Sequence, residues 1–344
     1  VRMEMDCKVF WYVLAESREL KPGIVLGRKI LDERIAVFRD EHNHVAAFQD
    51  RCLHRAGPLS RGRVVRGQLH CPYHGWTYEG TGRVVDIPSL GPHPEQIGQR
   101  IVKTYTVREV DGYVYVCLSE SLSDEFEPFR MPHYGEKGWR TIRLTNRFRN
   151  TVTNCVENFV DIPHTAYVHA GIFRSRKNEK LIASIARKKG SVTATYRRER
   201  ANLGIFSWFL NPSGREIVHT DSFYMPNVTC VEYIFGPRRH FIITSQSVPA
   251  ADDDTLVYTD LTFNYGIWNW IAPFFVRKQG QKIIDQDVEI LNLQMDVIKR
   301  YGEQFSNTPA DLIHVFIESI RQDLEMGRDP RLLPEQSREV EFWV

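Results

Sequence analysis

The stretch CLHRAGPLSRGRVVRGQLHCPYHGW, residues 52–76, decides how the first third of the chain is interpreted. It holds Cys52 and His54 in one short segment and Cys71 and His74 in another, with the spacing C-x-H-x16-C-x2-H. Two thiolates and two imidazoles on two similar loops form a ligand set for one [2Fe–2S] cluster, with both cysteines on one iron and both histidines on the other. The sequence therefore predicts an iron–sulfur site between these loops.

A Cys2His2 zinc site is the alternative for the same four residues, because tetrahedral coordination by two sulfurs and two nitrogens suits either metal. Zinc fingers usually place two cysteines in one short segment and two histidines in another. Here each segment supplies one residue of each kind, and Gly67, Gly80 and Gly82 allow the tight turns that surround small inorganic sulfides. These features favour the cluster over zinc.

The phrases Cys52-x-His54-Arg55 and Cys71-Pro72-Tyr73-His74-Gly75-Trp76 resemble the signature of a Rieske domain. Short apolar runs on both sides of the two loops, separated by polar turns such as Asp111-Gly112, predict a small antiparallel β domain. We assign residues 1–122 to this Rieske [2Fe–2S] domain. The charged, proline-bearing residues 119–129 are the expected linker.

The remaining residues, 123–344, show a different pattern. Helices are predicted over 150–170, 281–300 and 310–326, and several strand-like runs lie between residues 181 and 264. A sheet with helices packed on one face is the natural arrangement, so we expect an α+β fold.

The predicted helix over 150–170 contains His164 and His169. Two histidines five residues apart lie about 140° apart on a regular helix, so they converge only if the helix is irregular. An ordinary helix start, with Asp161 near the cap and Pro163 in the first turn, is the alternative. However, the pattern D-x-x-H-x4-H resembles the mononuclear iron motif of Rieske non-haem iron oxygenases. Such a centre is a 2-His-1-carboxylate triad.

A third ligand is expected from the predicted helix over 281–300. Apolar residues recur there at steps of three and four, and Asp287 borders this stripe whereas Asp285 falls on the opposite side. An unpartnered carboxylate beside a core is costly, and a metal ion is a suitable partner. The segment around Asp287 also resembles the family's triad aspartate segment. Asp287 is therefore the expected ligand, with Asp285 as the second choice and a salt bridge to an arginine as the non-metal alternative.

The resemblance covers nearly the whole chain and implies the alpha (oxygenase) subunit of a Rieske non-haem iron oxygenase of the compact, homotrimeric type. Residues 123–344 are then a catalytic mononuclear iron domain of helix-grip, START-like form. The implied cofactors are the Rieske [2Fe–2S] cluster and a mononuclear non-haem Fe(II). An NAD(P)H-fed reductase or ferredoxin would supply electrons for the O2-dependent mono- or dioxygenation of an aromatic or other hydrophobic ring substrate.

Two other functions stay open from the sequence. One is oxidative O- or N-demethylation within the same family, and the other is a Rieske electron carrier without a catalytic iron. The resemblance also implies that Asp161 links the triad to a Rieske histidine, here His74, of a neighbouring protomer. Four residues on strand-like runs are candidates for lining a substrate cavity, with plain core packing as the alternative: Phe223, Met225, Asn227 and Phe263.

Composition excludes several broad classes of protein. The chain of 344 residues has 45 Lys and Arg against 43 Asp and Glu, and 42% of its residues are hydrophobic. This balance is typical of a globular protein and indicates neither a disordered chain nor a general nucleic-acid binder. The uncharged run over 261–276 is shorter than the roughly 20 apolar residues that a membrane span needs. We expect no membrane span, no secretory leader and a cytoplasmic location.

Overall fold

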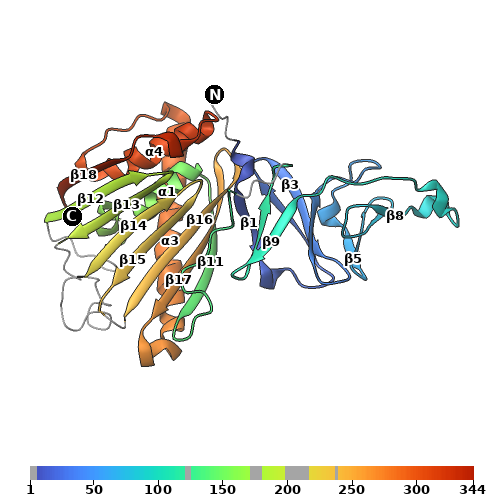
Figure 1. Cartoon of the computed structure of the whole chain (residues 1–344), viewed down its shortest axis with the longest axis horizontal. Coiled ribbons are helices and arrows are strands. Elements are labelled where there is room, and N and C mark those ends of the chain that lie inside the picture. Colours follow the sequence, from blue (N-terminus) through green and yellow to red (C-terminus); the bar gives the residue numbers. More distant parts are fainter. Residues whose placement is uncertain (1–5, 121–124, 171–179, 198–216, 237–238) are drawn as a thin grey trace. The chain divides into compact units, whose positions relative to one another are not determined.

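The computed structural model describes residues 6–120, 125–170, 180–197, 217–236 and 239–344. Its contacts divide the chain into two units (Figure 1). The N-terminal unit comprises Lys8–Arg130 and Pro249–Ala251, and the C-terminal unit comprises Val1–Cys7, Met131–Val248 and Asp252–Val344.

The expected domain boundary at residue 122 lies outside the described residues. Residues 126–129 belong to the N-terminal unit because they are hydrogen-bonded to it. The indole N–H of Trp11 donates to the Phe126 carbonyl (2.9 Å), and the hydroxyl of Tyr115 donates to the Phe129 carbonyl (3.0 Å). The described chain therefore changes unit between residues 130 and 131.

The described residues of the N-terminal unit form three small sheets, in the strand orders β1-β10-β9, β2-β3-β4 and β5-β6-β7-β8, and the strand pairs are antiparallel. The predicted Asp111-Gly112 turn joins β9 to β10, and both residues have the positive φ (49° and 75°) that such a hairpin turn requires. The strands are β1 (Trp11–Glu16), β2 (Val25–Ile30), β3 (Glu33–Arg39), β4 (Val45–Gln49), β5 (Arg63–Val65), β6 (Gln68–His70), β7 (Thr77–Tyr78), β8 (Val84–Asp86), β9 (Thr106–Val110) and β10 (Tyr113–Cys117).

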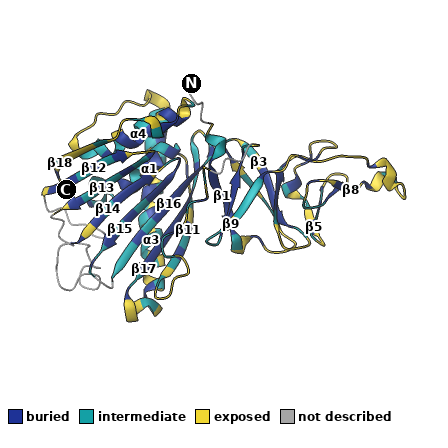
Figure 2. Ribbon diagram, in the orientation of Figure 1, coloured by how far each residue is buried: buried dark blue, intermediate teal, exposed yellow. Residues whose placement is uncertain are grey.

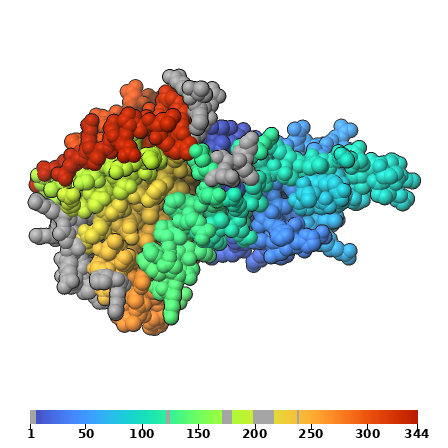
Figure 3. All heavy atoms as spheres, viewed as in Figure 1, coloured from blue at the N-terminus to red at the C-terminus, as the bar shows by residue number. Residues whose placement is uncertain are grey.

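One eight-stranded sheet forms the frame of the C-terminal unit, in the order β11-β17-β16-β15-β14-β13-β12-β18. The last strand returns to the edge of the sheet beside β12, so in Figure 3 the red C-terminal residues lie along the green ones. Figure 2 shows that the strands are mostly buried or half-buried. They are β11 (Arg140–Phe148), β12 (Lys180–Lys188), β13 (Ser191–Arg197), β14 (Val218–Tyr224), β15 (Val228–Ile234), β16 (His240–Ala251), β17 (Asp254–Asn264) and β18 (Gln336–Trp343).

In the described part of the chain, the α-helices that pack against this sheet are α1 (Val152–Val160), α3 (Ala272–Tyr301) and α4 (Leu312–Glu325). Helix α1 contacts β14 and β15, α3 contacts β11, and α4 contacts β13. Because α1 also contacts α3 and α4, the helices form one layer on the sheet. The predicted α+β class, with an antiparallel sheet packed by helices, is confirmed.

The prediction of one helix over 150–170 is wrong beyond Val160. Asp161 follows α1 in an extended conformation (φ −86°, ψ 109°), and a short 3-10 turn, η6 (Pro163–Ala166), comes next. Pro163 cannot donate a helical hydrogen bond, and its ring clashes with the carbonyl four residues before it in a continuous helix. The break frees the two histidines after it from helical spacing.

The other two predicted helices are confirmed with shifted ends. Helix α3 contains the predicted 281–300 segment and begins nine residues earlier, at Ala272, whereas α4 begins at Leu312 after a 3-10 turn, η9 (Pro309–Asp311). Among the described residues, no helix is both long and apolar enough to cross a membrane.

A fully buried asparagine, Asn150, ties α1 to α3. Its side-chain amide donates to the Leu291 carbonyl (2.7 Å) and to Oε1 of Gln294 (3.0 Å), while its Oδ1 accepts from Nδ2 of Asn154 (2.8 Å). Its carbonyl accepts from the hydroxyl of Thr255 on β17 (2.8 Å). One side chain therefore sets the distance between the two helices that carry the candidate site.

We expect Asn150→Ala to lower the free energy of unfolding by about 3 kcal/mol, because it leaves several buried hydrogen-bonding groups without partners. Urea unfolding followed by circular dichroism measures the change. The control is Asp296→Ala on α3, where an exposed ion pair to Arg149 (3.7 Å) is lost and a change below about 0.5 kcal/mol is expected. Equal stability of the two variants would contradict this account.

Candidate functional site

The first candidate site consists of two loops in the N-terminal unit with the same backbone pattern. In the loop after β4, the Cys52 amide donates to the Gly57 carbonyl (2.8 Å), and the Ala56 amide donates to the Cys52 carbonyl (3.0 Å). Ala56 has a positive φ of 54°. This left-handed residue turns the chain back toward its starting point.

The loop between β6 and β7 repeats this pattern around the second cysteine. The Cys71 amide donates to the Trp76 carbonyl (2.8 Å), and the Gly75 amide donates to the Cys71 carbonyl (3.1 Å). Gly75 takes the left-handed position, with φ 73°. The two loops are therefore equivalent cradles, each presenting one cysteine and one histidine.

The four predicted cluster ligands divide by burial. Cys52 and Cys71 are 2% and 4% exposed, and both belong to the apolar core cluster of this unit. His54 and His74 are exposed, and their ring centroids are 4.5 Å apart. The thiols therefore point inward, whereas the imidazoles lie together at the surface, where they are accessible to an electron-transfer partner.

The surroundings of the two thiols fit an iron–sulfur cluster. Burial raises the pKa of Cys71 and the neighbouring Cys52 raises it further, although the backbone amides of Tyr73 and His74 lower it by donating to the sulfur. Two adjacent buried thiolates need a cationic partner, which cluster iron supplies. Gly57 completes the cradle, because a Cβ there would lie 3.3 Å from Sγ of Cys71.

Sequence reasoning missed one residue at this site, Tyr78 on β7. Its hydroxyl accepts from the Leu53 amide (3.0 Å) and lies 3.1 Å from Sγ of Cys52. With the hydroxyl oxygen accepting from Leu53, its proton is placed to donate to the sulfur. No spacing rule pointed to Tyr78, because it lies outside both ligand loops.

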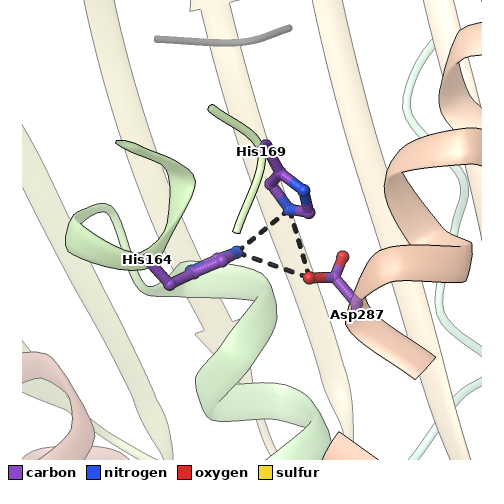
Figure 4. Close-up of side chains that lie close together, drawn as sticks. All are labelled: His164, His169 and Asp287. Carbon is purple, nitrogen blue, oxygen red and sulfur yellow. Dashed lines mark hydrogen bonds and ion pairs between the residues drawn. The ribbon is translucent and has the colours of Figure 1, made fainter. Parts of the chain in front are cut away.

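The second candidate site brings His164, His169 and Asp287 together (Figure 4). The two Nε2 atoms are 3.3 Å apart, and Oδ1 of Asp287 lies 3.5 Å from Nε2 of His164 and 3.1 Å from Nε2 of His169. The first histidine comes from η6 and the second follows it, while Asp287 comes from α3. Asp285, the second choice, is exposed and bonds Gln281 (2.7 Å) instead.

Each imidazole of the triad is oriented by a side-chain oxygen close to its Nδ1. Nδ1 of His164 is 3.2 Å from Oδ2 of Asp161, and Nδ1 of His169 is 3.0 Å from Oε1 of Gln286. A proton on Nδ1 that is donated to these oxygens leaves the lone pair of each Nε2 directed at the centre of the triad. Gln286 was not predicted, although it is the residue next to Asp287.

The electrostatics of the triad favour a charged carboxylate. Burial lowers the pKa of His164, but Asp161 and Asp287 outweigh burial and raise that pKa to about 9. Burial raises the pKa of Asp287, but the two imidazoles that face its Oδ1 outweigh burial and hold the pKa below its ordinary value. The carboxylate is therefore ionised at neutral pH, as a metal ligand must be.

The donor set fits a divalent metal ion. Oδ1 of Asp287 is a buried oxygen that accepts no hydrogen bond from the described residues, yet the imidazole nitrogens face it. Two imidazoles and one carboxylate on one side of a metal are the facial arrangement that suits Fe(II). A metal at the centre would satisfy all three groups.

The triad lies in the wall of a cavity of about 460 Å³. One wall comes from α1, η6, η8 (Gly266–Trp270) and α3, and the other comes from the strands β14 to β17. Most of the lining is apolar or aromatic, which suits a hydrophobic small molecule. The lining residues on the strands are His219, Asp221, Val231, Tyr233, Phe241, Ile243, Thr259 and Leu261.

None of the four residues suggested as cavity lining lies in this cavity. Phe223 and Phe263 are fully buried core residues, and Phe263 stacks on Tyr265 with ring centroids 4.8 Å apart. Asn227 donates to the Ser247 carbonyl (2.8 Å), and Met225 packs against Gly190. The core alternative is therefore correct for Phe223, Asn227 and Phe263, whereas Met225 is half-buried.

Comparison with known protein families gives a match in each half of the chain. Residues 10–106 match the Rieske [2Fe-2S] domain, and residues 149–316 match the vanillate O-demethylase oxygenase C-terminal domain. The chain belongs to the Rieske non-haem iron oxygenases. The resemblance inferred from the two motifs is confirmed, and the matched ranges contain both loops and the triad.

Individual relatives cover the chain to different extents. It is 33% identical over 175 residues to Protein TIC 55, chloroplastic, of Pisum sativum, across 49% of this chain and 31% of that protein. It is 32% identical over 191 residues to the oxygenase component of Dicamba O-demethylase of Stenotrophomonas maltophilia, across 54% of each. The chain thus spans about a third to a half of these relatives' lengths. A crystal structure of dicamba monooxygenase with 3,6-dichlorosalicylic acid shares the fold, with TM-score 0.80 and 21% identity over 94% of this chain and 98% of that one.

We expect Cys71→Ser to abolish the visible absorption of the Rieske cluster while mononuclear iron stays bound, because the two sites lie in different units. Absorption spectra and iron content per chain measure both effects. Cys117→Ser is the matched control, since it removes another buried cysteine of the same unit. An unchanged cluster spectrum in Cys71→Ser would show that these loops do not hold the cluster.

We expect Asp287→Ala to remove the mononuclear iron and to leave the Rieske spectrum intact, because Asp287 is the one anionic residue of the triad. Asp285→Ala, two residues earlier on α3, should keep the wild-type iron content. Iron analysis of both purified variants decides the matter. The assignment is wrong if Asp285→Ala loses the iron and Asp287→Ala keeps it.

Proposed function

We propose that this chain is the oxygenase component of a Rieske oxygenase system that oxidises a hydrophobic substrate with O2. The observation that carries this proposal is the triad of His164, His169 and Asp287 in the wall of a mostly apolar cavity. A protein that only carried electrons would need neither the second metal site nor the cavity. The cavity supports a hydrophobic, ring-sized substrate.

The two sites divide the chemistry between them. Cys52, His54, Cys71 and His74 would hold the Rieske cluster, which supplies electrons one at a time when bound. His164, His169 and Asp287 would hold mononuclear Fe(II), which supplies the chemistry of O2 when bound. Electrons would come from an NAD(P)H-fed reductase or ferredoxin, as the resemblance to the family implies.

The chain's own residues orient the ligands and exclude water. Asp161 and Gln286 fix the ring planes of His164 and His169 by bonding their Nδ1 atoms. The apolar walls keep bulk water from the reacting groups and strengthen the electrostatic interactions inside. The substrate is therefore positioned by shape on most of its surface and by few polar contacts.

Oxidative demethylation is the second candidate reaction at the same site. It is supported by the match of residues 149–316 to a vanillate O-demethylase domain and by the dicamba O-demethylase relative. Ring hydroxylation and demethylation need the same ligands and differ in which carbon of the substrate lies beside the metal.

A turnover experiment with a surrogate reductase tests the proposal. The chain is incubated with NADH, O2 and a panel of aromatic compounds with and without methoxy groups, and products and formaldehyde are measured. We expect about three irons per chain and O2-dependent product formation, with formaldehyde released if the reaction is demethylation. About two irons per chain with no product from any compound would instead indicate an electron carrier.

We also propose that the active form is a homotrimer in which Asp161 links the two kinds of site. Oδ2 of Asp161 bonds His164, while its Oδ1 lies 4.0 Å from Nε2 of His314 and is not hydrogen-bonded to the triad. A carboxylate can accept an N–H on each oxygen. His74 of a neighbouring copy would donate to Oδ1, which makes the electron path pass from one chain to the next.

Asp161→Asn tests this link, because it keeps the shape of the side chain and removes its charge. We expect both metal sites to stay loaded and product formation by the pre-reduced variant to fall at least about 100-fold in a single turnover. Asp311→Asn, which changes a second acid 4.0 Å from His314, is the control and should react at the wild-type rate. A wild-type rate in Asp161→Asn would show that Asp161 has only a structural role. Such a role would survive the change, because Asn caps a turn as well as Asp does.

A further inference from the structure

A buried histidine–aspartate pair interrupts the apolar strand wall of the cavity. His219 and Asp221 on β14 both line the cavity, and Nε2 of His219 lies 2.8 Å from Oδ1 of Asp221. Their side chains are 0% and 2% exposed. The pair is contributed by the sheet, whereas the metal ligands come from η6, the residues after it, and α3.

The strand register explains how His219 is held. Tyr196 on β13 and Tyr233 on β15 lie directly opposite it on the two neighbouring strands. The ring of Tyr233 stacks on the imidazole with centroids 4.2 Å apart, and the ring of Tyr196 lies 4.7 Å away on a tilted plane. The imidazole therefore has a fixed plane and directs Nε2 at Asp221.

The same register places an apolar residue directly opposite Asp221 on each of the two adjacent strands. Ala194 on β13 and Val231 on β15 lie opposite it, and neither side chain can donate a hydrogen bond. Among the described residues, the side chain of Asp221 is hydrogen-bonded to His219 alone. Its second oxygen, Oδ2, is thus an acceptor in the cavity wall.

Burying the Asp221 carboxylate in this way costs free energy unless a ligand also donates a hydrogen bond to it. A carboxylate taken out of water loses several kcal/mol of solvation, which one hydrogen bond to a histidine offsets only in part. The hydroxyl of Thr259, on the same wall, is hydrogen-bonded to Ser245 (3.2 Å). Asp221 is therefore the strongest acceptor that the strand wall offers to a ligand.

We propose that the His219–Asp221 pair is the polar subsite for the substrate and selects molecules that donate a hydrogen bond. This proposal rests on the proposed function and narrows its substrate class. The expected substrate has a hydrophobic body and a hydroxyl or N–H group that donates to Oδ2 of Asp221. An anionic substrate is disfavoured, because its carboxylate would face the Asp221 carboxylate in a medium of low polarity.

Equilibrium binding without turnover tests the subsite separately from the reaction. The metal-loaded chain is titrated without O2 or reductant, by calorimetry, with three probes of the same ring size: 2-naphthol, 2-methylnaphthalene and 2-naphthoate. We expect the wild type to bind 2-naphthol about tenfold more tightly than either other probe, as one hydrogen bond to a buried charge predicts. Equal affinity for all three probes, or tighter binding of 2-naphthoate, overturns the proposal without using any variant.

Asp221→Asn supplies the second measurement, because an amide can donate a hydrogen bond where the carboxylate cannot. We expect the preference for 2-naphthol over 2-naphthoate to fall at least about tenfold. Glu232→Gln is the matched control. It removes an acid on the neighbouring strand that points to the other face of the sheet, and it should keep the wild-type preference. An unchanged preference in Asp221→Asn would show that the pair is only structural.

The two proposals fail in different ways. If the probes are discriminated as expected but no compound is turned over, the subsite stands and the proposed reaction does not. If turnover occurs and the probes are not discriminated, the reaction stands and the role of Asp221 is wrong.

Discussion

The carboxylate of Asp287 is deeply buried and needs a partner that balances its charge. The C-terminal unit brings two imidazoles to it. Oδ1 of Asp287 faces two imidazole nitrogens and accepts no hydrogen bond from the described residues. Bringing those nitrogens to one point requires that the chain leave the helix after Val160, because a continuous helix would separate two histidines five residues apart. The extended Asp161 and the following Pro163 produce this break. Asp161 then holds the first imidazole by its Nδ1, so the helix break and the ligand orientation have the same cause.

The motifs could be predicted from the sequence because their members lie close together along the chain. Each cluster loop spans six residues with the same hydrogen-bond pattern, and a short repeat of cysteine and histidine reports such local geometry directly. Asp287 could be predicted for a related reason: helical periodicity shows which acid borders the apolar stripe, and the structure buries that one and exposes Asp285. The end of α1 was missed because periodicity continues past Pro163, although the backbone cannot.

The cavity could not be predicted, because its limits depend on how the helices cover the sheet. Alternation along β17 correctly places Thr259, Leu261 and Phe263 on one face, but only the first two line the cavity, since Phe263 packs on Tyr265. Asp221 and Phe223 on β14 differ in the same way. Tyr78 and the His219–Asp221 pair depend on which strands lie side by side, and one sequence does not contain that information.

The two walls of the cavity together constrain a bound molecule more than either does alone. The proposed metal ligands come from the helical side, and His219 and Asp221 form an ion pair on the strand side. Shape alone orients an apolar molecule poorly, because apolar contacts have no direction. One hydrogen bond to Asp221 would remove this freedom, since it would fix which end of the molecule faces the sheet and therefore which carbon faces His164, His169 and Asp287. Under the proposed function, the position of the oxidised carbon relative to the donating group would then decide whether a ring carbon or a methoxy carbon reacts. The choice between hydroxylation and demethylation would in that case depend on the distance between β14 and α3.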